Sequence, residues 1–242
     1  MNRVTLLLLA VLALGVVNVF QYLKPRETLS DQQAVDRFTT LFFHDEKALW
    51  SNHYLGIPTL QNPLDVWITQ EIFFEVKPDV IVETGTYKGG SALLWSTFLE
   101  TINPDHRIIT VDIENVAQEA RRLNLRKRKV TFLVGSSTDP AIVQQVRDGL
   151  GNGRVLVILD SDHSKDHVLN ELHAYAPMVS LGSYLIVQDG VVNGNPLLPD
   201  HGPGPLEAVE EFLETNDQFV IDEGRERLYM TYNPKGFLRR VR

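Results

Sequence analysis

Short runs rich in β-branched and aliphatic residues alternate with helical patterns over most of this chain. The runs predicted to be strands are Val80–Glu83, Arg107–Asp112, Val130–Val134, Val155–Asp160 and Tyr184–Asp189. The helical patterns between them include Ser91–Thr101, Ala141–Gly149 and Lys165–Ala176. Strands that alternate with helices of this length predict βαβ units, in which neighbouring strands run parallel in one sheet.

The last part of the chain departs from this alternation. Two short β-rich runs, Phe219–Ile221 and Leu228–Tyr232, are separated by a charged turn, which predicts an antiparallel hairpin. Together these patterns predict an α/β fold: a Rossmann-like, doubly wound, mostly parallel seven-stranded sheet that the antiparallel C-terminal hairpin completes. In such a sheet, ligands bind beyond the carboxyl ends of the strands, so the residues directly after each strand are candidates for function.

Composition divides the 242 residues into three predicted segments. Residues 1–23 form a hydrophobic N-terminal anchor or signal, residues 24–63 a linker with a helical and loop segment, and residues 64–242 the α/β domain. A helix is predicted from Asp31 to Phe43, because Ser30 and Gln33 have the spacing of a capping box. The net charge of −8 argues against nucleic acid as a partner, and the absence of cysteine excludes disulfides and cysteine-ligated zinc.

The N-terminal segment is uncharged between Arg3 and Lys24. A helix needs roughly 20 mostly apolar residues to cross a bilayer, and the run from Val4 to Leu23 barely reaches this length. We therefore expect a single-pass membrane anchor, which makes the membrane a partner of the protein. Two alternatives stay open: a cleaved signal peptide, which would leave a secreted protein, and a buried N-terminal helix.

The first predicted strand runs into a glycine-rich turn, Glu83-Thr84-Gly85-Thr86-Tyr87-Lys88-Gly89-Gly90-Ser91. Glycines let the backbone approach a ligand closely, and the following helix offers free N–H groups at its N-terminus. The spacing is not that of the dinucleotide fingerprint, and an acid before the turn would repel a pyrophosphate. The acid suits a cationic ligand such as S-adenosylmethionine. The alternative is that the segment is only an ordinary strand–turn–helix joint. The candidate cofactor contacts here are Glu83, Gly85, Thr86, Tyr87, Gly89 and Ser91.

The next two strand ends supply candidate contacts for the rest of that cofactor. Asp112 ends the second strand, where a carboxylate can accept both ribose hydroxyls; the alternative is a cap of the next helix. Ser136 and Ser137 follow the third strand and could face the adenine. The adjacent Asp139-Pro140 pair predicts a helix cap with proline at the first helical position.

The densest polar group, Asp160-Ser161-Asp162-His163, follows the fourth strand over the expected reacting centre. Asp160 could ligate a metal or bind the amino group of the cofactor. His163 could be a general base, because the ordinary pKa of histidine is about 6.5. Asp189 ends the fifth strand and should face Asp160, and two carboxylates can form a Mg²⁺ site.

With these motifs in this order, the chain resembles the cephalosporin hydroxylase and rhamnosyl O-methyltransferase family from about Gly56 to the C-terminus. The motifs that carry the resemblance are Gly-Ile-Pro and Asn-Pro-Leu-Asp within 56–65, Glu-Thr-Gly-Thr-Tyr at 83–87, Leu-Asp-Ser-Asp-His-Ser at 159–164, Gly-Pro-Gly-Pro-Leu-Glu-Ala at 202–208 and the closing Asn-Pro-Lys-Gly-Phe-Leu-Arg-Arg.

The resemblance implies a class I methyltransferase fold that transfers a methyl group from S-adenosylmethionine to a hydroxyl. It implies cofactor contacts at Glu83, Gly85 and Asp112, and a Mg²⁺ site at Asp160 and the acidic pair after the fifth strand. In this chain that pair is Gln188-Asp189, where the family usually has Glu-Asp. The loss of one negative charge predicts weaker binding of a hard cation.

We therefore expect an S-adenosylmethionine-dependent O-methyltransferase that acts on a hydroxyl of a small or lipid-linked sugar or secondary metabolite. One rival is a nucleotide-dependent oxidoreductase, which Glu83 and the missing fingerprint disfavour. The other is a membrane-tethered, non-catalytic binding protein on a methyltransferase fold, which only Gln188 favours. A non-haem iron site at His163 and His167 is disfavoured, because His163 precedes its helix and His167 is expected on the outer face of that helix.

Overall fold

The computed structural model describes residues 29–124 and 129–242. The chain divides into two compact units, Met1–Ala34 and Val35–Arg242. In the first unit, the backbone N–H of Gln33 donates to Ser30 Oγ at 3.2 Å, and that of Ser30 donates to Gln33 Oε1 at 2.9 Å. This is the predicted capping box, and helix α2 (Asp31–His44) begins at the predicted residue.

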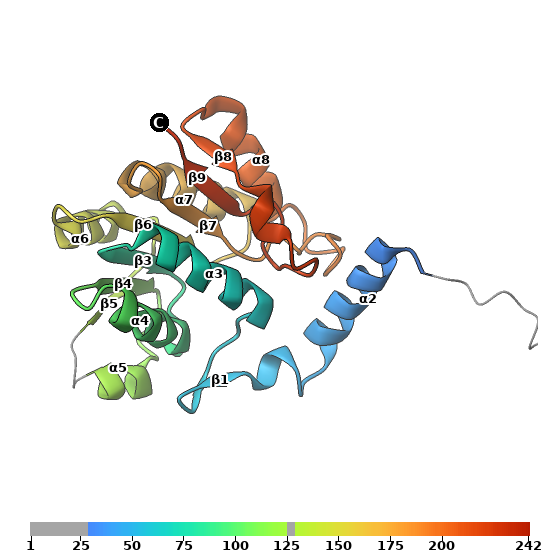
Figure 1. Ribbon diagram of the computed structural model, residues 1–242, viewed down its shortest axis with the longest axis horizontal. Helices are drawn as coiled ribbons and strands as arrows, with labels where there is room; N and C mark the ends of the chain where they lie inside the picture. The colour runs from blue at the N-terminus through green and yellow to red at the C-terminus, as the bar shows by residue number, and fades with distance from the viewer. Residues whose placement is uncertain (1–28, 125–128) are drawn as a thin grey trace, which may run out of the picture. The chain divides into compact units, whose positions relative to one another are not determined.

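The second unit is built on a seven-stranded sheet with the order β5-β4-β3-β6-β7-β9-β8 (Figure 1). The parallel strands are β3 (Val80–Thr84), β4 (Arg107–Asp112), β5 (Val130–Val134), β6 (Val155–Leu159) and β7 (Tyr184–Val187). The antiparallel strands are β8 (Phe219–Ile221) and β9 (Phe237–Arg240). The predicted fold class is confirmed, and the strand order reverses between β3 and β6.

Alternate residues along the strands pack into two cores, one on each face of the sheet. Val80 and Val82 pack with α6 (Pro140–Leu150), α7 (Lys165–Tyr175) and α8 (Pro205–Thr215). On the other face, Ile81 packs with α3 (Pro63–Val76), α4 (Gly90–Ile102) and α5 (Gln118–Asn124). Because helices cover both faces, the central strands are apolar at nearly every position, as parallel strands usually are.

Several elements were not predicted. Asn62 caps helix α3, because its side chain accepts the backbone N–H of Leu64 at 3.1 Å, and Pro63 occupies the first helical position. The sequence predicts residues 24–63 as a linker with a helical and loop segment, and it assigns no helix to the residues directly after them. The short elements are η1 (Leu49–Ser51), β1 (His53–Tyr54), β2 (Ile57–Pro58), η2 (Ala176–Met178) and η3 (Glu223–Glu226).

The second strand of the predicted hairpin was placed wrongly. The antiparallel partner of β8 is β9, not Leu228–Tyr232. A buried carboxylate explains the difference: Asp65 of α3 accepts the backbone N–H of Tyr232 at 2.7 Å and the Thr231 hydroxyl at 2.6 Å. The segment is thereby held against α3, and its backbone donor is unavailable to a strand ladder.

The predicted membrane anchor is also corrected. Across residues 29–124 and 129–242, no helix combines the length and the apolar character that crossing a bilayer requires. The run Val4–Leu23, on which the anchor was predicted, lies outside the described residues.

The loop after β3 passes directly against the end of β6. Gly85 has a φ of +83°, and a Cβ atom there would lie 1.6 Å from the carbonyl oxygen of Asp160. The backbone N–H of Asp160 donates to the carbonyl of Thr84 at 3.1 Å, which holds the two segments together. Only glycine meets both requirements, so this residue brings the ends of β3 and β6 close to each other.

We expect Gly85→Ala to lower the free energy of unfolding by about 3 kcal/mol or more, because the added methyl group displaces the Asp160 backbone. Gly182→Ala is the matched control. Gly182 also has a positive φ, +78°, but nothing lies within 4 Å of the added Cβ. That variant measures backbone strain alone, which costs about 1 kcal/mol. Equal losses in urea denaturation of the two variants would contradict the steric explanation.

Candidate active site

A cavity of 680 Å³ opens at the carboxyl ends of the parallel strands. Most predicted site residues line it: Gly85, Thr86, Tyr87, Ser91, Asp112, Ser137, Asp160, His163 and Asp189. Four others are described but lie outside the lining: Glu83, Gly89, Ser136 and Gln188. The topology therefore brings together residues from five strand ends, as the position of the switch point predicts.

Glu83 lies beneath the glycine turn rather than in the cavity wall. Its carboxylate is fully buried and accepts the Trp95 indole N–H at 2.9 Å and the Thr110 hydroxyl at 2.7 Å. Burial raises the pKa of this carboxyl to about 7. The residue thus joins β3, β4 and α4 below the cavity, and a direct contact with a ligand is not retained.

Asp112 at the end of β4 holds the glycine turn in place. Its Oδ2 accepts the backbone N–H of Tyr87 at 2.7 Å, and its Oδ1 accepts that of Glu114 at 2.9 Å. It does not cap a helix, because α5 begins only at Gln118. Each carboxylate oxygen keeps a further lone pair, so Asp112 can still accept hydroxyl groups from the cavity.

The loop after β5 contributes one serine to the cavity and one to its own structure. Ser137 is buried and lines the cavity, whereas the Ser136 hydroxyl lies 3.0 Å from that of Thr138 within the loop. The cap at Asp139-Pro140 is confirmed, since the Asp139 side chain accepts the backbone N–H of Ala141 at 2.7 Å.

His167 was predicted on the outer face of α7, and this is wrong. Its ring lines the cavity, and Nε2 lies 3.1 Å from the Ser137 hydroxyl and 3.5 Å from Glu171 Oε1. Residues four apart share one face of a helix, so His167 and Glu171 face inward together.

Asp160, His163 and Asp189 form a cluster of charged groups at the switch point. Each offers one ligand atom, and these atoms all lie within 4.8 Å of one another. His163 Nε2 is 3.2 Å from Asp189 Oδ2 and 3.7 Å from Asp160 Oδ1. Asp189 adopts a left-handed backbone with a φ of +58°, a conformation that non-glycine residues rarely hold outside functional or turn positions.

The charges in this cluster depend on one another. Burial raises the pKa of Asp160, and the nearby Asp189 carboxylate raises it further. Burial opposes the charged form of His163, but the Asp189 and Asp160 carboxylates outweigh it and raise the pKa of the imidazole. Without a bound cation, a protonated His163 is therefore the positive charge between the two acids at neutral pH.

Gln188 pairs with another glutamine instead of joining the cluster. Gln61 Nε2 donates to Gln188 Oε1 at 2.9 Å, and Gln188 Nε2 donates to Gln61 Oε1 at 3.1 Å. Gln61 Nε2 also lies 2.9 Å from Asp160 Oδ2, so it binds one oxygen of that carboxylate. The sequence contained no signal for Gln61, which reaches this position from 127 residues away along the chain.

The cluster fits a divalent cation. His163 Nε2 is buried without a hydrogen-bond partner among the described residues, although two carboxylate oxygens lie nearby. Neighbouring ligands of an octahedral ion with bonds of about 2.1 Å lie about 3 Å apart, close to the spacing of His163 and Asp189. Of the predicted ligands, Asp160 and Asp189 fit this site. His163 offers a nitrogen atom beside them, and the amide pair holds Gln188 aside.

The family described as rhamnosyl O-methyltransferase/CmcI matches residues 46–241. The chain belongs to this family. The rhamnosyl O-methyltransferase of Mycobacterium bovis (strain BCG / Pasteur 1173P2) is 40% identical over 190 residues, which cover 76% of each chain. That of Mycobacterium leprae (strain TN) is 36% identical over 76% of this chain and 81% of its own. The chain is thus an S-adenosylmethionine-dependent O-methyltransferase, and neither rival class is retained.

Solved structures confirm the fold of this family member. CmcI without ligand has a TM-score of 0.61 and is 19% identical, over 79% of this chain and 76% of that one. CmcI with Mg and S-adenosylmethionine has a TM-score of 0.59 at 18% identity, over 79% and 77%. TomG from Streptomyces achromogenes, in complex with S-adenosylmethionine, has a TM-score of 0.53 at 17% identity, over 93% and 96%.

The raised pKa of Glu83 predicts a pH dependence of stability. Its pKa in the folded state, about 7, exceeds its ordinary 4.5, so the folded state binds the proton more tightly. The contribution of Glu83 to the free energy of unfolding is therefore complete below pH 4.5, and it is lost as the pH rises through about 7. Glu83→Gln keeps the shape without the titration and should flatten this fall, by up to about 3 kcal/mol. Urea denaturation from pH 4.5 to 7.5 measures it; identical slopes in both proteins would contradict it.

Proposed function

We propose that this enzyme methylates a hydroxyl group of a rhamnosyl residue or a closely related sugar. The observation that carries the proposal is the convergence of Asp160, His163 and Asp189 in one wall of a cavity that also holds the glycine turn. The names of the curated relatives, rhamnosyl O-methyltransferases, support a sugar acceptor.

The cofactor would lie along the strand ends. The turn from Gly85 to Ser91 offers backbone N–H groups at the start of α4, and Asp112 offers carboxylate oxygens for the ribose. Asp160 offers an oxygen for the amino group or for a cation. In this arrangement the sulfonium methyl group would lie near the acidic cluster, and the adenine would lie toward Ser137.

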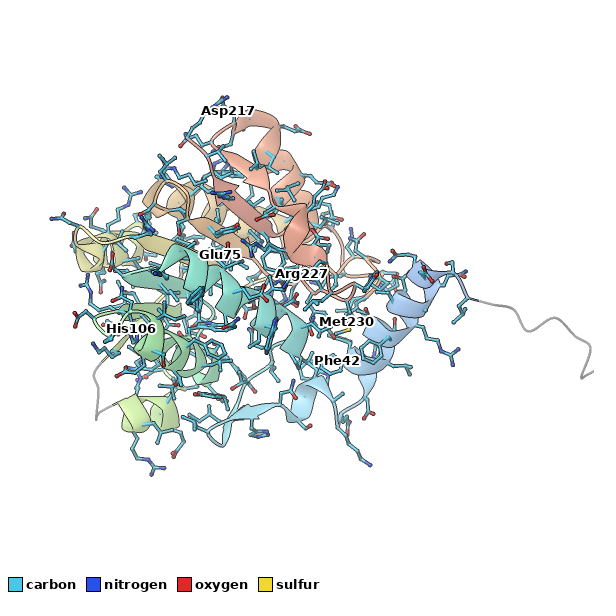
Figure 2. All side chains as sticks on the ribbon, viewed as in Figure 1. Phe42, Glu75, His106, Asp217, Arg227 and Met230 are labelled. Atoms are coloured by element: carbon cyan, nitrogen blue, oxygen red, sulfur yellow. The ribbon has the colours of Figure 1, made fainter. Side chains whose placement is uncertain are left out.

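The acceptor would enter from the other end of the cavity. Phe43, Leu49 and Trp50 line it there together with Val191 and Tyr232. The segment before α3 is held on this side by the contact of Phe42 with Tyr232, whose ring centroids lie 6.3 Å apart at 73°. Phe42 is labelled in Figure 2, and so is Met230, which belongs to the same C-terminal segment as Tyr232.

The reaction is an in-line displacement. The acceptor oxygen attacks the methyl carbon, the carbon–sulfur bond breaks, and the sulfur keeps the electron pair in neutral S-adenosylhomocysteine. The acceptor proton passes to a carboxylate of the cluster. A divalent ion bound by Asp160, His163 and Asp189 would lower the pKa of the acceptor hydroxyl. Because its pKa is raised, His163 is protonated at neutral pH when no cation is bound, so it is then a poor base and balances the charge of the two carboxylates.

The function is tested by binding and by turnover. Calorimetry of residues 29–242 should show binding of S-adenosylmethionine and S-adenosylhomocysteine, and no binding of NAD(P). With phenyl α-L-rhamnoside as the acceptor, mass spectrometry should detect one added methyl group. If both cofactors bind and a panel of other sugar and phenol acceptors is methylated while rhamnosides are not, the rhamnosyl acceptor is contradicted and the enzyme class is retained.

Two titrations test the cation site. Electron paramagnetic resonance measures the binding of Mn²⁺, and calorimetry measures the binding of Mg²⁺. Asp160→Asn and Asp189→Asn should each weaken Mn²⁺ binding by at least about tenfold, because each removes a charged ligand. Asp162→Asn is the matched control, since Asp162 lines the same cavity but lies outside the cluster. Gln188→Glu should tighten Mg²⁺ binding by restoring a second acid at this strand end. Unchanged Mn²⁺ affinity in both cluster variants would contradict the site.

The role of the cation in turnover is a separate measurement. If the ion is required, EDTA should abolish methyl transfer, and excess Mg²⁺ at millimolar scale should restore it. Full activity in EDTA, combined with a loss on the order of 10²–10⁴-fold in His163→Ala, would show that His163 acts as the base instead.

A further inference from the structure

A buried acid on α7 takes no part in the reaction proposed above. Glu171 is fully buried, and its Oε1 accepts the Ser161 hydroxyl at 2.7 Å. Its Oε2 is buried without a hydrogen-bond partner in the described part of the chain. A carboxylate in this position is costly unless a positive group stands beside it.

The positive group beside it is His167. This imidazole lies one helical turn before Glu171, and the hydrogen bond with Glu171 raises the pKa of His167. The second contact of Nε2 is the Ser137 hydroxyl at 3.1 Å. Because these two groups contact Nε2, Nδ1 is the remaining polar atom of the ring. The His167 side chain lines the cavity and is 24% exposed.

The position of His167 along the cavity indicates what it meets. The acidic cluster at the ends of β6 and β7 marks the reacting end, and Asp112 at the end of β4 marks the ribose. The base of the cofactor then extends toward β5, the next strand in the sheet. The loop after β5 carries Ser137, which His167 contacts. The imidazole thus lies in the wall of the base-binding end.

This wall is rigidly built. The Tyr175 hydroxyl donates to the carbonyl oxygen of Ser137 at 2.7 Å, so α7 holds the loop after β5 through both Tyr175 and His167. Ser161, directly after Asp160, fixes Glu171 from the other side. A ring held between two partners loses little entropy when a ligand binds, which favours recognition.

We propose that His167 recognises the edge of the cofactor adenine through a hydrogen bond, and that Glu171 is a positioning residue that orients the imidazole. This inference rests on the proposed placement of S-adenosylmethionine. The edge of adenine presents an acceptor at N1 and a donor at the N6 amino group. Hypoxanthine presents the opposite pair, so a hydrogen bond from one fixed imidazole nitrogen distinguishes the two bases.

The test compares S-adenosylhomocysteine with S-inosylhomocysteine by calorimetry on the same proteins. The wild type should bind the adenine compound roughly tenfold to a hundredfold more tightly, the range expected for one hydrogen bond to a charged group. His167→Ala should lose most of this discrimination by weakening binding of the adenine compound alone. Glu171→Gln, which keeps the shape of the side chain, should reduce the discrimination and leave part of it.

The matched control is His173→Ala. His173 lies on the same helix but packs against Phe212, with ring centroids 5.8 Å apart, and does not line this cavity. It should keep both affinities. In turnover, His167→Ala should raise KM for S-adenosylmethionine and leave kcat nearly unchanged, because the adenine takes no part in the methyl transfer.

Two results would overturn the inference: equal affinity of the wild type for both compounds, or unchanged discrimination in His167→Ala, whether both affinities weaken equally or neither changes. Equal weakening would show that His167 only supports the wall. These results differ from failure of the proposed function, in which the wild type would bind neither S-adenosylmethionine nor S-adenosylhomocysteine. Should Glu171→Gln fail to fold, the comparison between His167→Ala and His173→Ala still decides.

Discussion

The contact between Gly85 and the carbonyl of Asp160 is the constraint on which the cavity depends. A side chain at position 85 would separate the ends of β3 and β6, the two strands at which the sheet reverses its order. Their closeness puts the glycine turn, which offers N–H groups, beside an acidic cluster that can hold a cation. In the proposed function, the cationic cofactor and the acceptor hydroxyl would therefore meet within one cavity.

Buried acids organise the surroundings of that space, and each has a different set of partners. Burial raises the pKa of Glu83, and donors from β4 and α4, which partly oppose that rise, hold its carboxyl in place. Asp65 accepts hydrogen bonds from Asn62, Thr231 and the backbone of Tyr232, and so brings the C-terminal segment to the acceptor end. Because an unpaired buried charge is costly, each of these contacts specifies one arrangement of the chain.

The Gln61–Gln188 pair stands where the resemblance implies an acid beside Asp189. An amide at position 188 removes one negative charge from the strand end, and Gln61 occupies the amide and one oxygen of Asp160 at once. The candidate ligand set of the proposed cation site is then two carboxylates and an imidazole. Such a mixed set has less preference for Mg²⁺ than an all-oxygen set, since imidazole favours transition metals.

The sequence by itself determined the parallel sheet, the glycine turn and the acids at the strand ends, because hydrophobic period and strand-end position are local properties. The closing strand was misplaced at Leu228–Tyr232, since a distant carboxylate, Asp65, takes the backbone donor of that segment. Only the tertiary structure brought Gln61 to Gln188 and turned His167 into the cavity. These contacts join residues far apart in the chain, and their energy depends on burial and partner geometry, which no local pattern records.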